Sequence, residues 1–184
     1  THVSWGPMAL CTRAAATGAG LPPDARPRAW HDRRSATPVR TPPMDIDEFM
    51  LIYKRAWETS DEHLVASLFA SDGVYRNTPF AEQRGHDAIK AYWQRTKLQE
   101  DIRLEYEVLE RHERGGIAHW HTTYQVTSDE LFRIWAASTG TNLVARRKGE
   151  ALPRLALDGI AMATFGFDGL CRELRLWWHS KIAG

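Results

Sequence analysis

The spacing of apolar residues changes near residue 100, and this change constrains the fold more than any other feature of the sequence. Before it, apolar side chains recur at helical spacing over about 45–58, 61–69 and 86–98, which predicts three helices, the first with Asp45 as its N-cap. After it, as in "IRLEYEVL" at 102–109, apolar and polar residues alternate, which predicts strands. Helices followed by antiparallel strands predict an α+β fold, with the helices packed on one face of a curved sheet.

Turn and capping residues divide the second half of the chain further. The "HERGG" stretch predicts that the strands at 102–109 and 117–126 pair as a hairpin. An inserted helix is expected at 127–138, with Thr127 as its N-cap. Two long strands then close the chain, joined by a turn at Asp168-Gly169.

Composition divides the chain at Met44. Seven of the nine prolines and six arginines precede this residue, with two acidic residues, no lysine and no apolar periodicity. Transit peptides share the Arg-rich, acid-poor composition, but the lack of a helical pattern favours a disordered leader over 1–43. Such a leader would be translated from upstream of a true start at Met44, and the folded domain is expected to span 44–184.

Charge and cysteine content exclude several classes of protein. The formal net charge is +1, and a nucleic-acid-binding domain usually has a basic stripe or a high pI. No apolar run approaches the roughly 18–20 residues needed to span a membrane. Cys11 and Cys171 lie far apart, and unpaired thiols are typical of a reducing compartment. The sequence therefore predicts a cytoplasmic protein that binds neither nucleic acid nor membrane.

Three stretches of the domain resemble a known superfamily when they are taken in order: "YKRAWETSDEHLVASLFASDGVYRNTPF", "RGHDAIKAYW" and "GIAMATFGFDGLCRELRLWWHS". This arrangement resembles the SnoaL-like branch of the nuclear-transport-factor-2-like superfamily over nearly all of 46–180, apart from an insertion at about 127–153. The resemblance implies a cone-shaped curved sheet wrapped around three N-terminal helices, with a small-molecule pocket at its open end. Members include polyketide cyclases, a steroid isomerase, dehydratases, epoxide hydrolases and non-catalytic dimerisation modules, so the resemblance alone implies no single function.

The steroid isomerase of this superfamily provides a test, because its chemistry needs three groups: a carboxylate that moves a proton, and a tyrosine and a protonated acid that hold the enolate oxygen. The resemblance places Tyr53 at the oxyanion tyrosine. Thr78 stands where the proton-moving carboxylate would be, and Ala161 where the second acid would be. A threonine is no base near neutral pH unless another group activates it, and an alanine has no acid to offer. The resemblance therefore does not carry over the isomerase mechanism.

The stretch "SDGVYRNTPF" at 71–80 predicts a turn, a short strand at 74–77 and then a loop. On the next-to-last strand, Gly159, Ala161 and Ala163 share one face, and three small side chains in a row leave volume that a close helix or a ligand must fill. A cavity and an ordinary packed core are both compatible with this pattern. The candidate catalytic residues are Tyr53 and Thr78, and the candidate ligand-binding residues are Trp57, Tyr75, Phe80, Trp120, Thr122, Ala161 and Trp178.

The opposite face of the sheet carries the only pair of residues that suggests a metal. His119 and His121 are two apart on one strand and therefore share a face, but no third ligand is clearly convergent with them, so no metal site is expected. The same face would show Ile160, Met162 and Trp177 among polar residues. Since members of the superfamily dimerise through this face, a homodimer is expected.

Two functions remain open from the sequence. One is a small-molecule-binding domain for an apolar ligand, without chemistry and without a cofactor. The other is a cofactor-independent enzyme of the cyclase, dehydratase or isomerase type, in which Tyr53 would polarise a carbonyl together with Tyr75 or Thr78. The second function lacks an identified base, and a titratable group inside the cavity would discriminate between the two.

Overall fold

A computed structural model describes residues 44–78, 80–140 and 150–183, all of which belong to one compact unit, Arg40–Gly184. The leader expected at 1–43 lies outside the described residues, as does Pro79. The elements in chain order are α1 (Ile46–Glu58), α2 (Glu62–Ser67), β1 (Phe69–Thr78), β2 (Ala81–Arg84), α3 (Gly85–Trp93), the 3₁₀ helix η1 (Gln94–Leu98), β3 (Gln99–His112), β4 (Gly115–Val126), α4 (Asp129–Thr139), β5 (Arg154–Phe165) and β6 (Cys171–Ile182).

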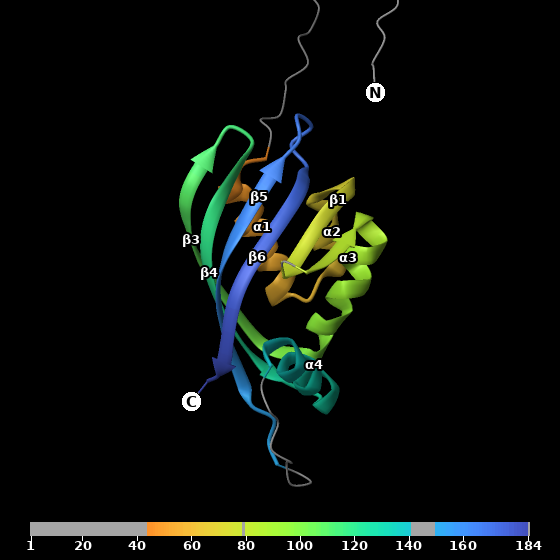
Figure 1. Ribbon diagram of the computed structural model, residues 1–184, viewed down its shortest axis with the longest axis vertical. Helices are drawn as coiled ribbons and strands as arrows, with labels where there is room; N and C mark the ends of the chain where they lie inside the picture. The colour runs from red at the N-terminus through yellow and green to blue at the C-terminus, as the bar shows by residue number, and fades with distance from the viewer. Residues whose placement is uncertain (1–43, 79, 141–149, 184) are drawn as a thin grey trace, which may run out of the picture. The chain divides into compact units, whose positions relative to one another are not determined.

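Six strands form one curved sheet in the order β2-β1-β6-β5-β4-β3, and the helices lie on its inner face (Figure 1). All neighbouring strands are antiparallel except β1 and β6, which are parallel. This confirms the α+β fold and the hairpin between the strands now labelled β3 and β4. The sheet is mixed rather than purely antiparallel, because β1 enters it beside the last strand of the chain.

The first strand is longer than the sequence predicts. The second helix was expected to run through Phe69, but α2 ends at Ser67 and Phe69 already pairs with Cys171 of β6. The loop expected after residue 78 contains β2, which pairs with β1 as a hairpin. The partner of β1 in β6 lies about a hundred residues away, so local spacing of apolar residues does not reveal where β1 begins. β2 is only four residues long and lies at the edge of the sheet, and its sequence AEQR has no apolar alternation.

Short-range signals at the helix ends and turns are mostly confirmed. Asp45 caps α1 by accepting a hydrogen bond from the Glu48 amide (2.9 Å). Gly169, in the turn between β5 and β6, has a φ of 80°, a conformation that favours glycine. The expected cap of the inserted helix was wrong by one residue: Ser128 accepts from the Leu131 amide, whereas the Thr127 hydroxyl donates to the carbonyl of Leu98.

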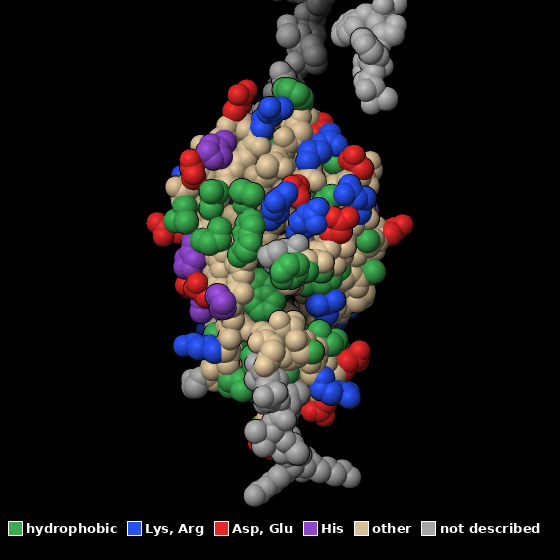
Figure 2. Space-filling model, in the orientation of Figure 1, with side chains coloured by type: hydrophobic (Ala, Val, Ile, Leu, Met, Phe, Trp, Pro, Cys, Tyr) green, Lys and Arg blue, Asp and Glu red, His purple; other side chains and the backbone are tan. Residues whose placement is uncertain are grey.

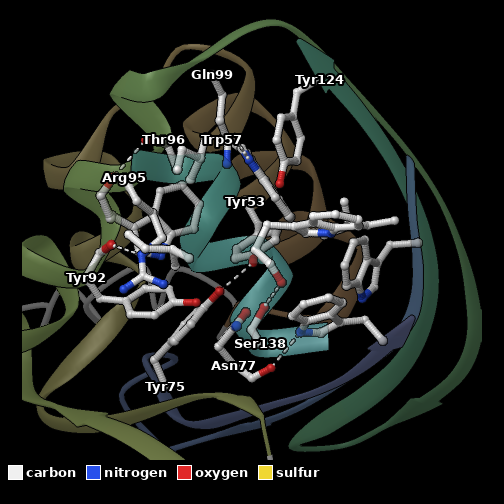
Figure 3. A pocket seen from close by; sticks show the side chains of 17 residues that line it. Tyr53, Trp57, Tyr75, Asn77, Tyr92, Arg95, Thr96, Gln99, Tyr124 and Ser138 are labelled. Atoms are coloured by element: carbon white, nitrogen blue, oxygen red, sulfur yellow. Dashed lines mark hydrogen bonds between the residues drawn. The ribbon is translucent and has the colours of Figure 1, made fainter. Parts of the chain in front are cut away.

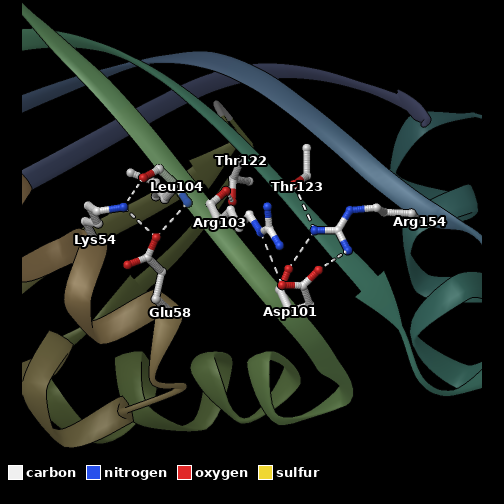
Figure 4. A network of polar contacts seen from close by, with 8 residues as sticks. All are labelled: Lys54, Glu58, Asp101, Arg103, Leu104, Thr122, Thr123 and Arg154. Atoms are coloured by element: carbon white, nitrogen blue, oxygen red, sulfur yellow. Dashed lines mark hydrogen bonds and ion pairs between the residues drawn. The ribbon is translucent and has the colours of Figure 1, made fainter. Parts of the chain in front are cut away.

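Polar contacts hold α1 against β3 (Figure 4). The Glu58 carboxylate accepts hydrogen bonds from the backbone amide of Leu104 (2.9 Å) and from Lys54, and Lys54 also donates to the Leu104 carbonyl. Further along β3, Asp101 accepts from Arg103 and Arg154. The contacts of Glu58 and Lys54 position α1, which carries Tyr53 and Trp57.

Hydrophobic packing sets the position of the same helix from the other side. Phe49 of α1 contacts the rings of Phe69 on β1 (centroids 6.2 Å apart) and Phe165 on β5 (5.7 Å). Cys171 is buried beside them with a free thiol. None of the helices in the described parts of the chain is long and apolar enough to cross a membrane.

Candidate functional site

A cavity of about 90 Å³ lies between the inner face of the sheet and the helices α1, α3 and α4 (Figure 3). A buried water molecule needs about 10–15 Å³ of such space, so the cavity has room for several waters or a small organic molecule. The described residues that line it are Tyr53, Trp57, Tyr75, Asn77, Tyr92, Trp93, Arg95, Thr96, Gln99, Trp120, Tyr124, Leu131, Ile134, Trp135, Ser138, Leu157 and Trp178. In the space-filling view a small hollow is visible above α4, next to β1 and α3 (Figure 2).

Five tryptophans form most of the apolar wall. Three of their indole N–H groups have partners in the protein: Trp57 donates to the side-chain oxygen of Gln99 (2.9 Å), Trp135 to the Ser180 hydroxyl (2.6 Å) and Trp178 to the carbonyl of Asn77 (2.8 Å). The indole N–H groups of Trp93 and Trp120 are buried without a hydrogen-bond partner. A buried hydrogen-bond donor without a partner lowers the stability of the fold. Trp93 and Trp120, which carry these two donors, both line the cavity.

Two tyrosines from different elements meet inside the cavity. Tyr53 on α1 and Tyr75 on β1 are both buried, and their hydroxyl oxygens are 3.0 Å apart (Figure 3). Burial is the main cause that raises the pKa of each above its ordinary value, so both are neutral at neutral pH. Because one hydroxyl donates to the other, the pair keeps one hydroxyl hydrogen for a further acceptor.

Two more tyrosines and one arginine also belong to the polar part of the wall. Burial raises the pKa of Tyr92 to about 12 and also raises that of Tyr124. The Arg95 guanidinium lies over the Tyr92 ring, 3.7 Å from the centroid, and its Nε–H donates to the Tyr92 carbonyl (2.9 Å). The positive charge of Arg95 acts against burial on the pKa of Tyr75, Tyr92 and Tyr124.

The strand parity predicted from the sequence is confirmed. Along β4, Ala118, Trp120, Thr122 and Tyr124 are buried on the inner face. Five of the residues expected at the site line the cavity: Tyr53, Trp57, Tyr75, Trp120 and Trp178.

Four residues expected at the site lie elsewhere. Thr78 follows Asn77 on β1, and because Asn77 points into the cavity, Thr78 points to the other face, beside Arg76 and Trp177. Phe80 is 98% exposed at the tip of the β1–β2 hairpin. Thr122 is buried, but its hydroxyl donates to the Arg103 carbonyl (2.9 Å), and it does not line the cavity.

The fourth is Ala161, which is buried in the packed core beneath the cavity. The small residues of β5 make room for aromatic rings rather than for a ligand. A Cβ added at Gly159 would be 2.9 Å from Cζ2 of Trp120, and Phe49 packs on Phe165 further along the strand. Of the two alternatives left open by the sequence, these residues of β5 belong to the packed core, and the cavity is lined instead by residues of other elements, including α3 and α4.

Sequence reasoning did not assign Tyr92, Arg95 or Gln99 to the site. Helical spacing alone indicates that Tyr92 points inward. The chain then changes from an α-helix to the 3₁₀ helix η1 just after Tyr92, and this change determines where Arg95 and Gln99 lie. The inserted helix α4 contributes Leu131 and Trp135 to the wall, so it covers one side of the cavity.

The outer face of the sheet carries a histidine pair with a carboxylate. His119 and His121 both face Asp158, at 3.1 Å and 3.6 Å. Within the described residues, no group of three or more metal-ligating side chains has a geometry that could hold a metal ion. These residues lie on the opposite side of the sheet from the tyrosine pair.

The chemistry available inside the cavity follows from its titratable groups. Among the described residues that line it, these are four tyrosines and Arg95, with no Asp, Glu, His or Cys. The tyrosines can donate or accept hydrogen bonds, but with raised pKa values they are not bases at neutral pH. The geometry provides apolar contact and hydrogen-bond donors.

The sequence over residues 52–171 matches the family described as a SnoaL-like domain, and the chain belongs to this family. No curated protein sequence matches the chain.

Several solved structures share the nuclear-transport-factor-2-like cone fold. The epoxide hydrolase/cyclase-like enzyme SalBIII, with a role in pyran ring formation in polyether salinomycin, is 10% identical over 74% of this chain and 95% of that chain, with a TM-score of 0.54. The Δ5-3-ketosteroid isomerase from Mycobacterium sp. is 13% identical over 75% and 98%, with a TM-score of 0.54. A computationally designed 17-OHP binder is 13% identical over 73% and 95%, with a TM-score of 0.50. At these identities the likeness shows the fold alone.

Proposed function

We propose that this SnoaL-like domain binds a small, largely apolar molecule in the cavity between the sheet and the helices. The observation that carries the proposal is the paired hydroxyls of Tyr53 and Tyr75, buried in a wall of tryptophan side chains. Apolar walls with a few placed polar groups are typical of small-molecule sites. The ligand packs its ring against the tryptophans and accepts the remaining hydroxyl hydrogen of the tyrosine pair with a carbonyl or similar oxygen.

Binding without chemistry fits the cavity better than proton-transfer catalysis does. A cyclase, dehydratase or isomerase needs a group that takes up a proton within hydrogen-bond reach of the substrate. The described wall has two hydroxyls in the place of an oxyanion hole but no carboxylate or imidazole. The solved structures with this fold include enzymes and a designed binder, so the fold is compatible with either function.

The test uses two probes that differ by one carbonyl group, acetophenone and ethylbenzene. Because five tryptophans line the cavity, binding is followed by quenching of tryptophan fluorescence. We expect acetophenone to bind about three- to tenfold more tightly than ethylbenzene, as one neutral hydrogen bond provides roughly 0.5–1.5 kcal/mol. The Tyr53→Phe/Tyr75→Phe double variant removes both hydroxyl hydrogens of the pair, so it should lose this preference and still bind ethylbenzene.

Tyr106→Phe is the matched control, because Tyr106 of β3 is the one tyrosine of the chain that does not line the cavity. It should leave both affinities unchanged. If neither probe binds the parent protein, or if Tyr106→Phe and the double variant have equal effects, the proposal is wrong. Turnover of a carbonyl substrate that Tyr53→Phe abolishes would support the enzyme alternative instead.

A further inference from the structure

The charge of the cavity wall indicates which chemical class of ligand the cavity can bind. Arg95 is the one charged residue among the described residues of the wall. No carboxylate within the described parts of the chain forms an ion pair with it; its Nε–H donates to a backbone carbonyl, and its Nη groups have no hydrogen-bond partner. The cavity therefore contains a positive charge that no carboxylate of the described residues pairs with.

The arginine is held in place rather than loose in solvent. Its guanidinium is stacked on the Tyr92 ring, and Tyr92 in turn contacts the Tyr75 ring, with centroids 5.4 Å apart. Figure 3 shows Arg95, Tyr92 and Tyr75 together on one side of the cavity. A stacked guanidinium with free Nη groups is suited to a planar carboxylate, which it can bind through two parallel hydrogen bonds.

Two further hydrogen-bond donors of the wall have no partner among the described residues. The indole N–H groups of Trp93 and Trp120 lack partners, although these side chains are only 2% and 1% exposed. The side-chain oxygen of Gln99, by contrast, already accepts from Trp57. A ligand that carries acceptors and a negative charge complements this wall, whereas a purely apolar ligand leaves the donors unpaired.

We propose that the ligand is a small carboxylate with one apolar ring, whose carboxylate group pairs with Arg95 while the ring packs among the tryptophans. This inference rests on the proposed function and specifies its ligand. A single ring is suited to the cavity volume of about 90 Å³. The tyrosine pair then holds a carboxylate oxygen in the way proposed above for a carbonyl oxygen.

The experiment compares benzoate with benzamide, which has the same ring and a planar group of similar size but no charge. Dissociation constants are measured at neutral pH by tryptophan fluorescence, with ligand-observed NMR as an independent readout. We expect benzoate to bind the parent protein at least tenfold more tightly than benzamide, and added salt to weaken the binding of benzoate only. Arg95→Gln should weaken the binding of benzoate about ten- to a hundredfold and leave benzamide within about twofold.

Lys97→Gln is the matched control, since Lys97 is in the same 3₁₀ helix but its side chain pairs with Glu62 outside the cavity. It changes the net charge equally and should leave benzoate binding unchanged. Retained binding of benzamide shows that the Arg95→Gln variant is folded. Arg95→Lys, which keeps the charge and loses the two parallel hydrogen bonds, should fall between the parent protein and Arg95→Gln.

The outcomes separate this inference from the proposed function. If benzamide and acetophenone bind but benzoate binds no more tightly than benzamide, the carboxylate ligand is overturned and the binding cavity remains. If Lys97→Gln weakens benzoate binding as much as Arg95→Gln does, the effect is one of net charge, and the role of Arg95 is overturned. If none of the probes binds, both proposals fall.

Discussion

The two faces of the sheet are built by the same strands and differ in what they present. On the inner face, Trp120 is buried against α1 and Gly159, and aromatic rings from several elements surround a cavity. On the outer face, Trp177 is 43% exposed. Asp158 and its two histidine partners lie on this face beside Ile160 and Met162. The comparison teaches that strand alternation determines which residues point inward, whereas the helices determine where the inner face stays open.

The largest difference between the faces is expected in stability. Trp120→Ala removes a buried ring that contacts Trp57, and we expect the free energy of unfolding to fall by about 3–5 kcal/mol. Trp177→Ala, at a concentration where the chain is monomeric, should change it by less than about 1 kcal/mol. Urea unfolding followed by circular dichroism measures both. Equal losses would show that the outer face is as tightly packed as the inner one.

The second prediction concerns the outer face itself, where we propose that a second copy of the chain binds. Figure 2 shows hydrophobic side chains grouped over this face next to basic ones, which is typical of an interface rather than of a free surface. Trp177→Glu should raise the dissociation constant of the dimer by about thirtyfold or more. Leu51→Glu, which changes an exposed leucine on α1, is the control. Analytical ultracentrifugation measures the dissociation constant of the dimer in each case. A parent protein that is monomeric would contradict the proposal.

A third prediction tests what the small residues of β5 are for. In Gly159→Ala the new Cβ would lie 2.4 Å from the Trp177 carbonyl oxygen and 2.9 Å from Trp120, so we expect a loss of about 1–3 kcal/mol in the free energy of unfolding. Thr164→Ala, at an exposed position of the same strand, should stay within about 0.5 kcal/mol. If Gly159→Ala is as stable as the parent protein and no longer binds acetophenone, Gly159 lines the binding site after all.

The smallest effect is expected for the polar contact between α1 and β3. Burial raises the pKa of Glu58, but hydrogen bonds from the Leu104 amide and Lys54 together outweigh it and hold the pKa below the ordinary 4.5. The ionised Glu58 therefore stabilises the fold above about pH 4.5, and this contribution is lost as the pH falls through the lower pKa of the folded state. Glu58→Gln should cost about 1 kcal/mol at neutral pH and nothing at a pH below the folded pKa. A cost that does not change with pH would mean that the charge of Glu58 contributes nothing.

More of the fold than of the candidate site could be predicted from the sequence. Alternation along β4 placed Trp120 inward and His119 outward, and Asp45 marked the start of α1. These are local signals, because each depends on side chains within a few residues of one another along the chain. The partnership of β1 with β6 was not visible, because it joins segments about a hundred residues apart.

Residues of the site were predicted only where a single helix or strand determines the direction in which the side chain points. Tyr53 and Tyr75 were both named, but their hydroxyl contact depends on how α1 sits on the sheet. Small residues on β5 were compatible with a cavity and with a packed core, and the structure places Trp120 against Gly159. Arg95 was missed because a 3₁₀ turn, rather than a continued helix, brings it to the cavity.

The central claim, that a small molecule binds on the inner face, is tested most directly by nuclear Overhauser contacts from bound acetophenone to the aromatic side chains. The account predicts contacts to the rings of Tyr53, Tyr75 and Trp120, which surround the cavity, and none to Trp177. Contacts to Trp177 alone would place the ligand on the outer face and contradict the account.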